Sequence, residues 1–316
     1  MRISCYSLET HSEVPADEIS KRLHHKKEVI WVDITLPSES GIDLMRNTFR
    51  FHELSIEDVL NQEQRPKAEE FPDHLFIILN PLDYRHGKVY PRELDVFVGH
   101  NYMVTVHTSR EPLIAEAQKR IGPDRVQFAV STTYLLYVLL DTIVDGYLPI
   151  LEKIENEIDS LGTRLMERPT KAMQRRLFEL KENLNAFWWI VWPQKDILNI
   201  LNNHDLIFIE GKSQYYLRDV DDHLQRITNI VQASRESITG LINLYLSAVS
   251  NQLNLAVNRL TIITLMSSAL AVIGGFYGMN FEQTWPPFDA PWGVAFVIAL
   301  MITVCLTIFL LVRRRD

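Results

Sequence analysis

Two long uncharged stretches near the end of the chain constrain its fold more than any other feature. The first covers residues 260–277 and has 18 consecutive residues without a charge. A helix of that length, rising about 1.5 Å per residue, spans ~27 Å, close to the hydrocarbon thickness of a bilayer. The second covers residues 293–312, is 20 residues long and is almost purely apolar. We therefore predict two membrane-spanning helices.

The charges beside these stretches predict the orientation of the chain. Arg259 precedes the first stretch and a basic tail, 313–316, follows the second, whereas the loop at 278–292 contains no Lys or Arg. Because cytoplasmic flanks are enriched in Lys and Arg, we expect both termini in the cytoplasm and the loop outside. We therefore expect the protein to be located in the cell membrane as a multi-pass protein.

The composition excludes several classes of function. The chain has 316 residues, a formal net charge of -8 and two cysteines. An acidic balance disfavours nucleic-acid binding, and two cysteines provide neither a disulfide framework nor a thiolate metal site. The sequence also lacks the HExxH, Walker, GxSxG and CxxC motifs. We therefore expect neither an enzyme nor a protein with a resident cofactor.

The N-terminal part reads as mixed strand and helix. Runs rich in Val, Ile, Phe and Tyr predict strands at 2–8, 29–35, 75–80, 94–98 and 103–107. Helices are expected at 38–48 and 55–61, the second with Ser55 as its N-cap, and a hairpin turn at 85–88.

From about residue 126 the spacing of apolar residues becomes helical. Helices are expected at 134–167, at 170–202 and from 215 onward, interrupted by Pro169, Pro193 and Gly211. The fold class expected is an α+β cytoplasmic domain, an α/β sandwich with long helices, whose stalk helix enters the membrane. The divisions expected are an α/β domain at 1–125, a helical region at 126–211, a stalk and first membrane helix at 212–277, an external loop at 278–292, a second membrane helix at 293–312 and a basic cytoplasmic tail at 313–316.

One face of the first membrane helix carries mostly small and polar side chains. Spacings of three or four residues place on this stripe Asn254, Val257, Thr261, Thr264, Ser268, Ala271 and Gly275, with Leu260 at its edge. Such residues serve helix packing in membrane proteins, and they also line water-filled pores. A pore lined by this stripe requires a homo-oligomeric ring, because one helix cannot enclose it.

The end of the first span carries the motif YGMNF at residues 277–281. This motif, before a short external loop and a second span with a basic end, resembles the CorA family of magnesium channels. The segments 54–71, 134–159, 165–169 and 243–254 also look like family segments in family order. The resemblance implies a homopentamer with Mg2+ as substrate and regulator; the number five comes from the resemblance alone.

The motif predicts a selectivity filter at Gly278, Met279 and Asn280. Mg2+ gives up its water reluctantly and prefers octahedral oxygen coordination. We therefore expect a ring of Asn280 carbonyls to bind the hydrated ion through its water shell. Gly278 is expected to end the helix in a left-handed cap, and Met279 to pack against this turn. Moving two charges through 100 mV is worth ~4.6 kcal/mol, so uptake needs no ATP.

The resemblance also implies gating by cytoplasmic Mg2+. The segment YLRD at 216–219 looks like the family segment with a regulatory carboxylate, which gives Asp219 that role. Its partner is expected in the hairpin of the adjacent subunit, where Asp83 precedes Arg85 by two positions. Facing carboxylates repel until a divalent cation neutralises them, so bound Mg2+ would hold the ring shut. An Asp219–Arg85 ion pair is the alternative closure.

Two other functions stay open on the sequence. A transporter of Zn2+, Co2+ or Ni2+ would share the architecture, although these ions prefer nitrogen or sulfur ligands and the mouth offers only Met279. A membrane-anchored coiled-coil sensor or adaptor would show no dependence on Asn280. Trp188, Trp189 and Trp192 are interpreted as helix core or inter-helix packing. A solvated face, with weak cation attraction as the alternative, is the interpretation for the acidic residues Asp141, Asp145, Glu152, Glu155, Glu157 and Asp159.

Overall fold

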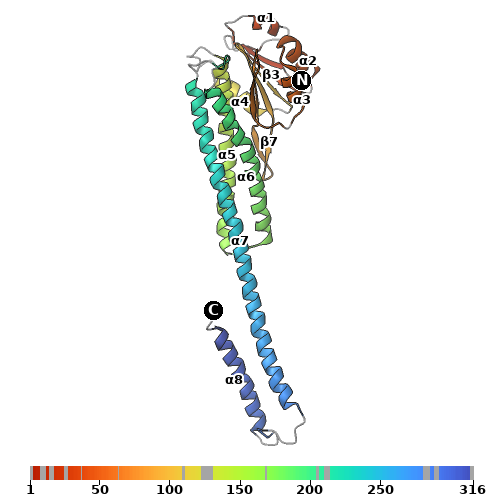
Figure 1. Cartoon of the computed structure of the whole chain (residues 1–316), viewed down its shortest axis with the longest axis vertical. Helices are drawn as coiled ribbons and strands as arrows, with labels where there is room; N and C mark the ends of the chain where they lie inside the picture. Colours follow the sequence, from red (N-terminus) through yellow and green to blue (C-terminus); the bar gives the residue numbers. More distant parts are fainter. Residues whose placement is uncertain are drawn as a thin grey trace. The chain divides into compact units, whose positions relative to one another are not determined.

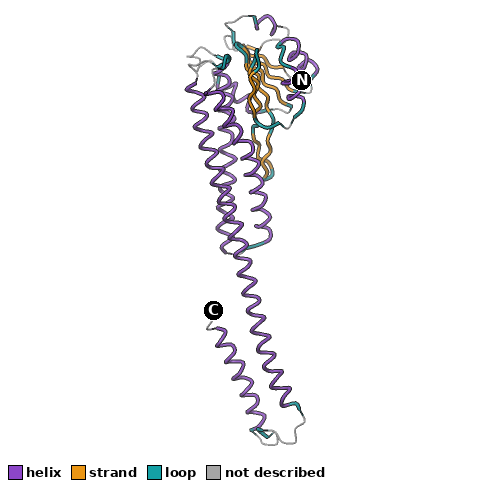
Figure 2. Tube along the Cα trace, viewed as in Figure 1, coloured by secondary structure: helices purple, strands orange, loops and turns teal. Residues whose placement is uncertain are grey.

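The fold divides into two compact units, Met1–Ile242 and Asn243–Asp316. The structure is a computed structural model in which the helices and strands are regular (Figures 1 and 2). The residues that it describes are 3–7, 12–13, 18–24, 28–36, 38–62, 64–108, 111–121, 131–167, 169–203, 206–209, 214–279, 285–287 and 292–313.

The first unit contains a seven-stranded sheet with the order β2-β1-β3-β9-β8-β5-β4. Its strands are β1 (Ile3–Ser7), β2 (Ser12–Glu13), β3 (Ile30–Thr35), β4 (Lys67–Glu70), β5 (Leu75–Leu79), β8 (Leu94–Val98) and β9 (Tyr102–His107). The pair β3 and β9 is parallel, with Ile30 opposite Tyr102, and every other neighbouring pair is antiparallel. All five predicted strands are confirmed. The charged edge strand β4 and the two-residue β2 were missed, because neither has the apolar alternation that signals a strand.

A separate hairpin joins β6 (Leu82–Arg85) to β7 (Lys88–Pro91). The predicted turn is confirmed, since Arg85 pairs with Lys88 across it. His86 and Gly87 have φ angles of 50° and 78°. Positive φ at both central residues is what a tight hairpin turn requires, because only that twist matches the flanking strands.

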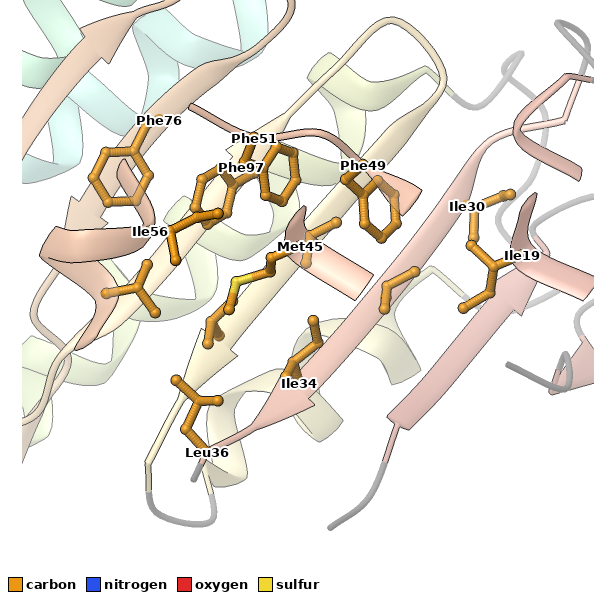
Figure 3. Close-up of a cluster of buried hydrophobic side chains, with 14 of the residues drawn as sticks. Ile19, Ile30, Ile34, Leu36, Met45, Phe49, Phe51, Ile56, Phe76 and Phe97 are labelled. Carbon is orange, nitrogen blue, oxygen red and sulfur yellow. The ribbon is translucent and has the colours of Figure 1, made fainter. Parts of the chain in front are cut away.

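One face of the sheet packs against four short elements. These are α1 (Ile19–Leu23), α2 (Glu39–Asp43), the π-helical turn η2 (Leu44–Thr48) and α3 (Glu53–Leu60). Ile30 and Ile34 of β3 point to this face and belong to one core with Met45 of η2 and Phe51; Ile30 lies beside Ile19 of α1 (Figure 3). Phe51 also stacks on Phe97 of β8, with ring centroids 3.9 Å apart. A continuous aromatic and aliphatic core therefore fixes this side of the sheet.

The opposite face meets α4 (Pro112–Arg120) and the long helices α5 (Thr132–Glu167) and α6 (Lys171–Asn203). The fully buried Tyr147 of α5 donates a hydrogen bond to the Asn80 carbonyl at 3.1 Å and accepts one from Gln194 of α6 at 2.7 Å. The first part of α7 (Gln214–Tyr277) runs beside α5 and α6 (Figure 1). Its Arg235 donates to Asn185 of α6 at 3.2 Å. The first unit is thus a sheet between two helical layers.

Two sequence-based predictions about helix ends are wrong. Pro193 does not interrupt a helix but lies inside α6, where packing of its neighbours outweighs the loss of about 3 kcal/mol that an interior proline brings. The N-cap of α3 is His52, whose ring accepts from the Leu54 N–H at 3.2 Å. Ser55 lies within the helix, fully buried, and its hydroxyl donates to the His52 carbonyl. Pro169 does separate α5 from α6, and Gly211 lies outside the described residues.

The second unit contains the rest of α7 and α8 (Gly293–Arg313), both unbroken helices (Figure 2). Three helices of the described chain are long and apolar enough to cross a membrane, namely α5, α7 and α8. The apolar window of α5 is 61% buried within the protein, against 0% for α7 and 11% for α8. The apolar surface of α5 is therefore already covered, whereas that of α7 and α8 is left for lipid or for other chains.

Candidate ion-conduction and regulatory sites

All eight residues of the predicted stripe lie on α7 and are exposed in the single chain. They are Asn254, Val257, Leu260, Thr261, Thr264, Ser268, Ala271 and Gly275. Even the apolar Val257 and Leu260 are 54% and 64% exposed. The Thr261 hydroxyl donates to the Val257 carbonyl one turn earlier at 2.9 Å, which satisfies its donor within the helix. The acceptor side of this hydroxyl stays open to a partner outside the helix.

The helix α8 packs on another face of α7. Met266 and Leu270 of α7 line an apolar hollow of about 440 Å³ together with Met301 and Cys305 of α8. Leu270 follows Ser268 by two positions, which turns its side chain by about 200° around the helix. The described part of α8 therefore leaves the stripe uncovered.

At the C-terminal end of α7, Gly278 does not adopt the predicted left-handed cap. Its N–H donates to the Gly274 carbonyl at 2.9 Å and so continues the helical hydrogen bonds by one residue. A Cβ at Gly278 would lie 3.0 Å from the Gly274 oxygen, a tight contact that glycine avoids. Met279 is 57% exposed in the single chain, so its expected packing against this turn stays a prediction. Asn280 lies outside the described residues.

The two predicted regulatory carboxylates belong to different elements. Asp219 is an exposed residue of α7, and Asp83 is a half-buried residue of β6. Asp83 forms an ion pair with Arg85 in its own hairpin, at 2.5 Å. Within one chain, Arg85 therefore pairs with Asp83 and not with Asp219.

A cluster that the sequence did not indicate forms where α4, α5 and α7 meet. Asp141 and Asp145 of α5 and His223 of α7 place their ligand atoms within 4.8 Å of one another. Arg120 of α4 holds the two carboxylates, donating to Asp141 at 2.8 Å and to Asp145 at 3.0 Å. Asp141 and Asp145 are half-buried and do not belong to the expected solvated face. No local pattern in the sequence shows that Arg120 and His223 pack beside them.

Charge and burial act together on this cluster. Burial raises the pKa of the Asp141 carboxyl, the neighbouring Asp145 and Asp219 raise it further, and Arg120 opposes them. Asp219 therefore lies close enough to act on the cluster although it is not one of its members. Carboxylates that lie close together favour a bound cation, which here is the Arg120 guanidinium.

The other acidic and aromatic interpretations are confirmed in part. Glu152, Glu155 and Asp159 are exposed, as expected of a solvated face, whereas Glu157 pairs with Arg176 of α6. The rings of Trp188 and Trp192 stack with centroids 4.9 Å apart, and Arg235 of α7 lies over Trp188. The contact of Arg235 with Trp188 is inter-helix packing, so the interpretation is confirmed for Trp188. It is wrong for Trp189 and Trp192, which are 57% and 48% exposed.

Comparison with known proteins identifies the family. The sequence profile of the family described as CorA-like Mg2+ transporter protein matches residues 26–314. The chain belongs to this CorA-like family. The cobalt/magnesium transport protein CorA of Thermotoga maritima is 31% identical over 317 residues, which cover 98% of this chain and 90% of the relative. The protein of the same name from Methanocaldococcus jannaschii is 24% identical, with 96% and 95% covered.

Solved structures show the CorA-like fold along most of the chain. The complete structure of the CorA magnesium transporter from Methanocaldococcus jannaschii matches with a TM-score of 0.80 at 22% identity and covers 91% of each chain. Full-length CmaX matches with a TM-score of 0.79 at 17% identity, with 99% of this chain and 97% of the other covered. The α/β domain, the long helices and the two apolar C-terminal helices are thus the CorA-like architecture. Membership makes the chain a divalent-cation transporter rather than an enzyme.

Proposed function

We propose that this protein is a Mg2+ channel of the cell membrane, built as a ring of copies whose α7 helices line the pore. The observation that carries the proposal is the polar stripe of α7, which α8 leaves uncovered in the single chain. Polar side chains within a membrane face other helices or water, because exposure to hydrocarbon costs free energy. A ring of α7 helices around a water-filled axis meets both requirements, and the family resemblance implies five subunits.

Selection takes place at the outer mouth, at Gly278, Met279 and Asn280. A ring of neutral amide oxygens binds hydrated Mg2+ through its water shell, and neutral ligands bind weakly enough for the ion to leave. The membrane potential drives uptake, with both termini in the cytoplasm.

Asp219 and the Asp83 of an adjacent subunit are the proposed regulatory Mg2+ ligands. Two carboxylates on neighbouring subunits repel until a divalent cation lies between them. The Asp83–Arg85 pair weakens this site, because Mg2+ has to compete with the guanidinium for one carboxylate.

Co2+ is a second candidate substrate, since two relatives carry the name cobalt/magnesium transport protein. The mouth provides oxygen ligands and one exposed thioether, Met279. Hydrated Co2+ therefore meets the same amide ring, and we expect Mg2+ to compete with it.

The experiment is cation uptake by the purified protein in vesicles held at a set inside-negative potential. We expect Mg2+ influx that rises with the potential, and Co2+ influx that excess Mg2+ suppresses. Vesicles without protein and vesicles at zero potential are the controls. If the correctly assembled protein conducts neither ion, the channel proposal is wrong and the adaptor alternative is favoured.

A further inference from the structure

A cavity in the first unit lies apart from the conduction path and the acidic cluster. Its volume is about 590 Å³, within the range of small-molecule sites in proteins. It opens where the loop before β4, the end of β5, the β7–β8 connection and the middle of α6 come together. The residues lining it that matter here are Gln64, Arg65, Asn80, Arg92, Glu93 and Trp189.

Two buried polar atoms of this cavity make no hydrogen bond within the described part of the chain. They are the side-chain oxygen Oδ1 of Asn80 and the Nε of Arg92. Asn80 is only 4% exposed, and its Nδ2 donates to the Gln64 carbonyl at 3.4 Å, which fixes which end of the amide is the acceptor. A buried polar group without a partner costs about 1–3 kcal/mol. The cavity therefore offers one unused acceptor and one unused donor.

The floor of the cavity is rigidly held. The backbone carbonyl of Asn80 accepts the hydroxyl of Tyr147, which itself accepts from Gln194. These bonds tie the end of β5 to α5 and α6. A site whose groups are already in place loses less free energy to ordering when a ligand binds.

Of the two arginines that line the cavity in the described part of the chain, one has no carboxylate partner and is left for an anion to neutralise. Arg92 pairs with Glu111 at 3.2 Å, and Glu93 accepts the Gln64 N–H at 2.5 Å. Arg65 has no carboxylate partner among the described residues; its guanidinium lies over the Trp189 ring, 4.8 Å from the centroid. Stacking on tryptophan positions a guanidinium and leaves its N–H donors free for an oxyanion.

We propose that this cavity binds a small organic anion that also carries an N–H or O–H donor. Its carboxylate or phosphate group accepts from Arg65 and from the Nε of Arg92, and its donor pairs with Oδ1 of Asn80. The exposed part of the Trp189 ring provides a surface for a flat portion of the molecule. Trp189, interpreted from the sequence as packing, is then a ligand-contacting residue.

The test is titration calorimetry on the full-length protein in detergent, at constant Mg2+, with tryptophan fluorescence recorded in parallel. Adenosine 5′-monophosphate serves as a ring-bearing phosphate and indole-3-acetate as a ring-bearing carboxylate; inorganic phosphate tests the oxyanion alone. We expect one ring-bearing probe to bind with a Kd below about 1 mM and inorganic phosphate to bind at least about tenfold more weakly. Which probe binds distinguishes phosphate from carboxylate.

Two variants on the rim keep the test independent of folding. Arg65→Gln and Trp189→Leu change exposed side chains, so the fold is expected to survive, and each should weaken the bound probe by about tenfold or more. Arg46→Gln removes a surface arginine that pairs with Glu53 elsewhere and should leave the Kd unchanged. The proposal is wrong if neither ring-bearing probe binds, or if Arg65→Gln binds as tightly as Arg46→Gln.

Discussion

At the scale of single residues, burial decides which groups respond to pH. His74 is 2% exposed, stacks on Phe71 with ring centroids 4.8 Å apart, and has an Nδ1 without a hydrogen-bond partner among the described residues. Burial lowers the pKa of His74 to about 4, against an ordinary value of 6.5, and the nearby Asp73 only partly opposes this. The folded protein therefore holds His74 neutral in mildly acidic solution.

This burial predicts a loss of stability in acid. Between pH 6.5 and about 4 the unfolded chain protonates His74 and the folded chain does not. The contribution of neutral His74 to the free energy of unfolding is therefore complete above pH 6.5 and decreases as the pH is lowered towards 4. We expect His74→Phe to flatten the fall of the unfolding temperature over this window, measured by thermal unfolding at several pH values. His86→Asn, at an exposed turn position that Asn tolerates, should keep the wild-type slope. Equal slopes for His74→Phe and wild type would contradict the assignment.

The proposed selectivity filter depends on one side chain from each subunit, Asn280. We expect Asn280→Ala to lower Mg2+ flux by more than about tenfold, because the ring loses the amide oxygens that bind the hydrated ion. Flux into vesicles and the elution volume of the purified protein should be measured together, and the elution volume should not change. Gln252→Ala, at an exposed amide on the opposite face of α7, is the matched control. Wild-type flux through Asn280→Ala would remove Asn280 from the filter.

At the scale of elements, α7 and α8 differ in which of their faces tolerate change. The stripe of α7 is uncovered, whereas the opposite face, with Met266 and Leu270, meets α8. α8 has no comparable polar stripe in its described residues, and its Leu300 is 37% exposed. The two helices are thus expected to have different roles, with α7 towards water and α8 towards lipid.

A pair of substitutions tests this division. Ser268→Leu places an apolar branched side chain on the stripe and should reduce Mg2+ flux by about tenfold or more, by narrowing or dewetting the pore. Leu300→Ala on α8 should change flux less than about twofold. Both variants are measured in the same vesicle assay after equal reconstitution. Similar losses in the two would show that the wrong helix had been assigned to the pore.

At the scale of the whole molecule, the proposed regulation depends on contacts between subunits. One chain pairs Asp83 with Arg85 and leaves Asp219 exposed beside the Asp141 cluster. A metal bridge between subunits would use Asp219 and compete with Arg85 for Asp83, whereas an Asp219–Arg85 pair would close the interface without metal.

Flux measured against internal Mg2+ separates these two arrangements. For a metal bridge, Asp219→Ala should raise the inhibiting Mg2+ concentration by about tenfold or more, and Arg85→Ala should lower it by freeing Asp83. For an ion-pair lock, both variants should open the channel. Glu236→Ala, at an exposed acid further along α7, is the control and should follow wild type. If all curves coincide, Asp219 is not a regulatory residue.

The sequence by itself determined the features that are local. The two long apolar runs predicted α7 and α8, and the run at 94–98 predicted both ends of β8. The RHGK segment predicted the hairpin turn. Each of these depends on the length or spacing of a single run, or on backbone angles that a short segment chooses for itself. The resemblance carried by YGMNF gave the family for the same reason, since the motif is contiguous.

Only the tertiary structure decided what depends on distant segments. Pro193 stays inside α6 because buried neighbours hold that helix, and His52 rather than Ser55 caps α3 because Ser55 is needed in the core. The Arg120–Asp141 contact joins α4 to α5 across 21 positions, and the cavity at Asn80 brings together four parts of the chain. No local sequence pattern predicts these contacts, because they arise from the packing of helices and strands that lie far apart in the sequence.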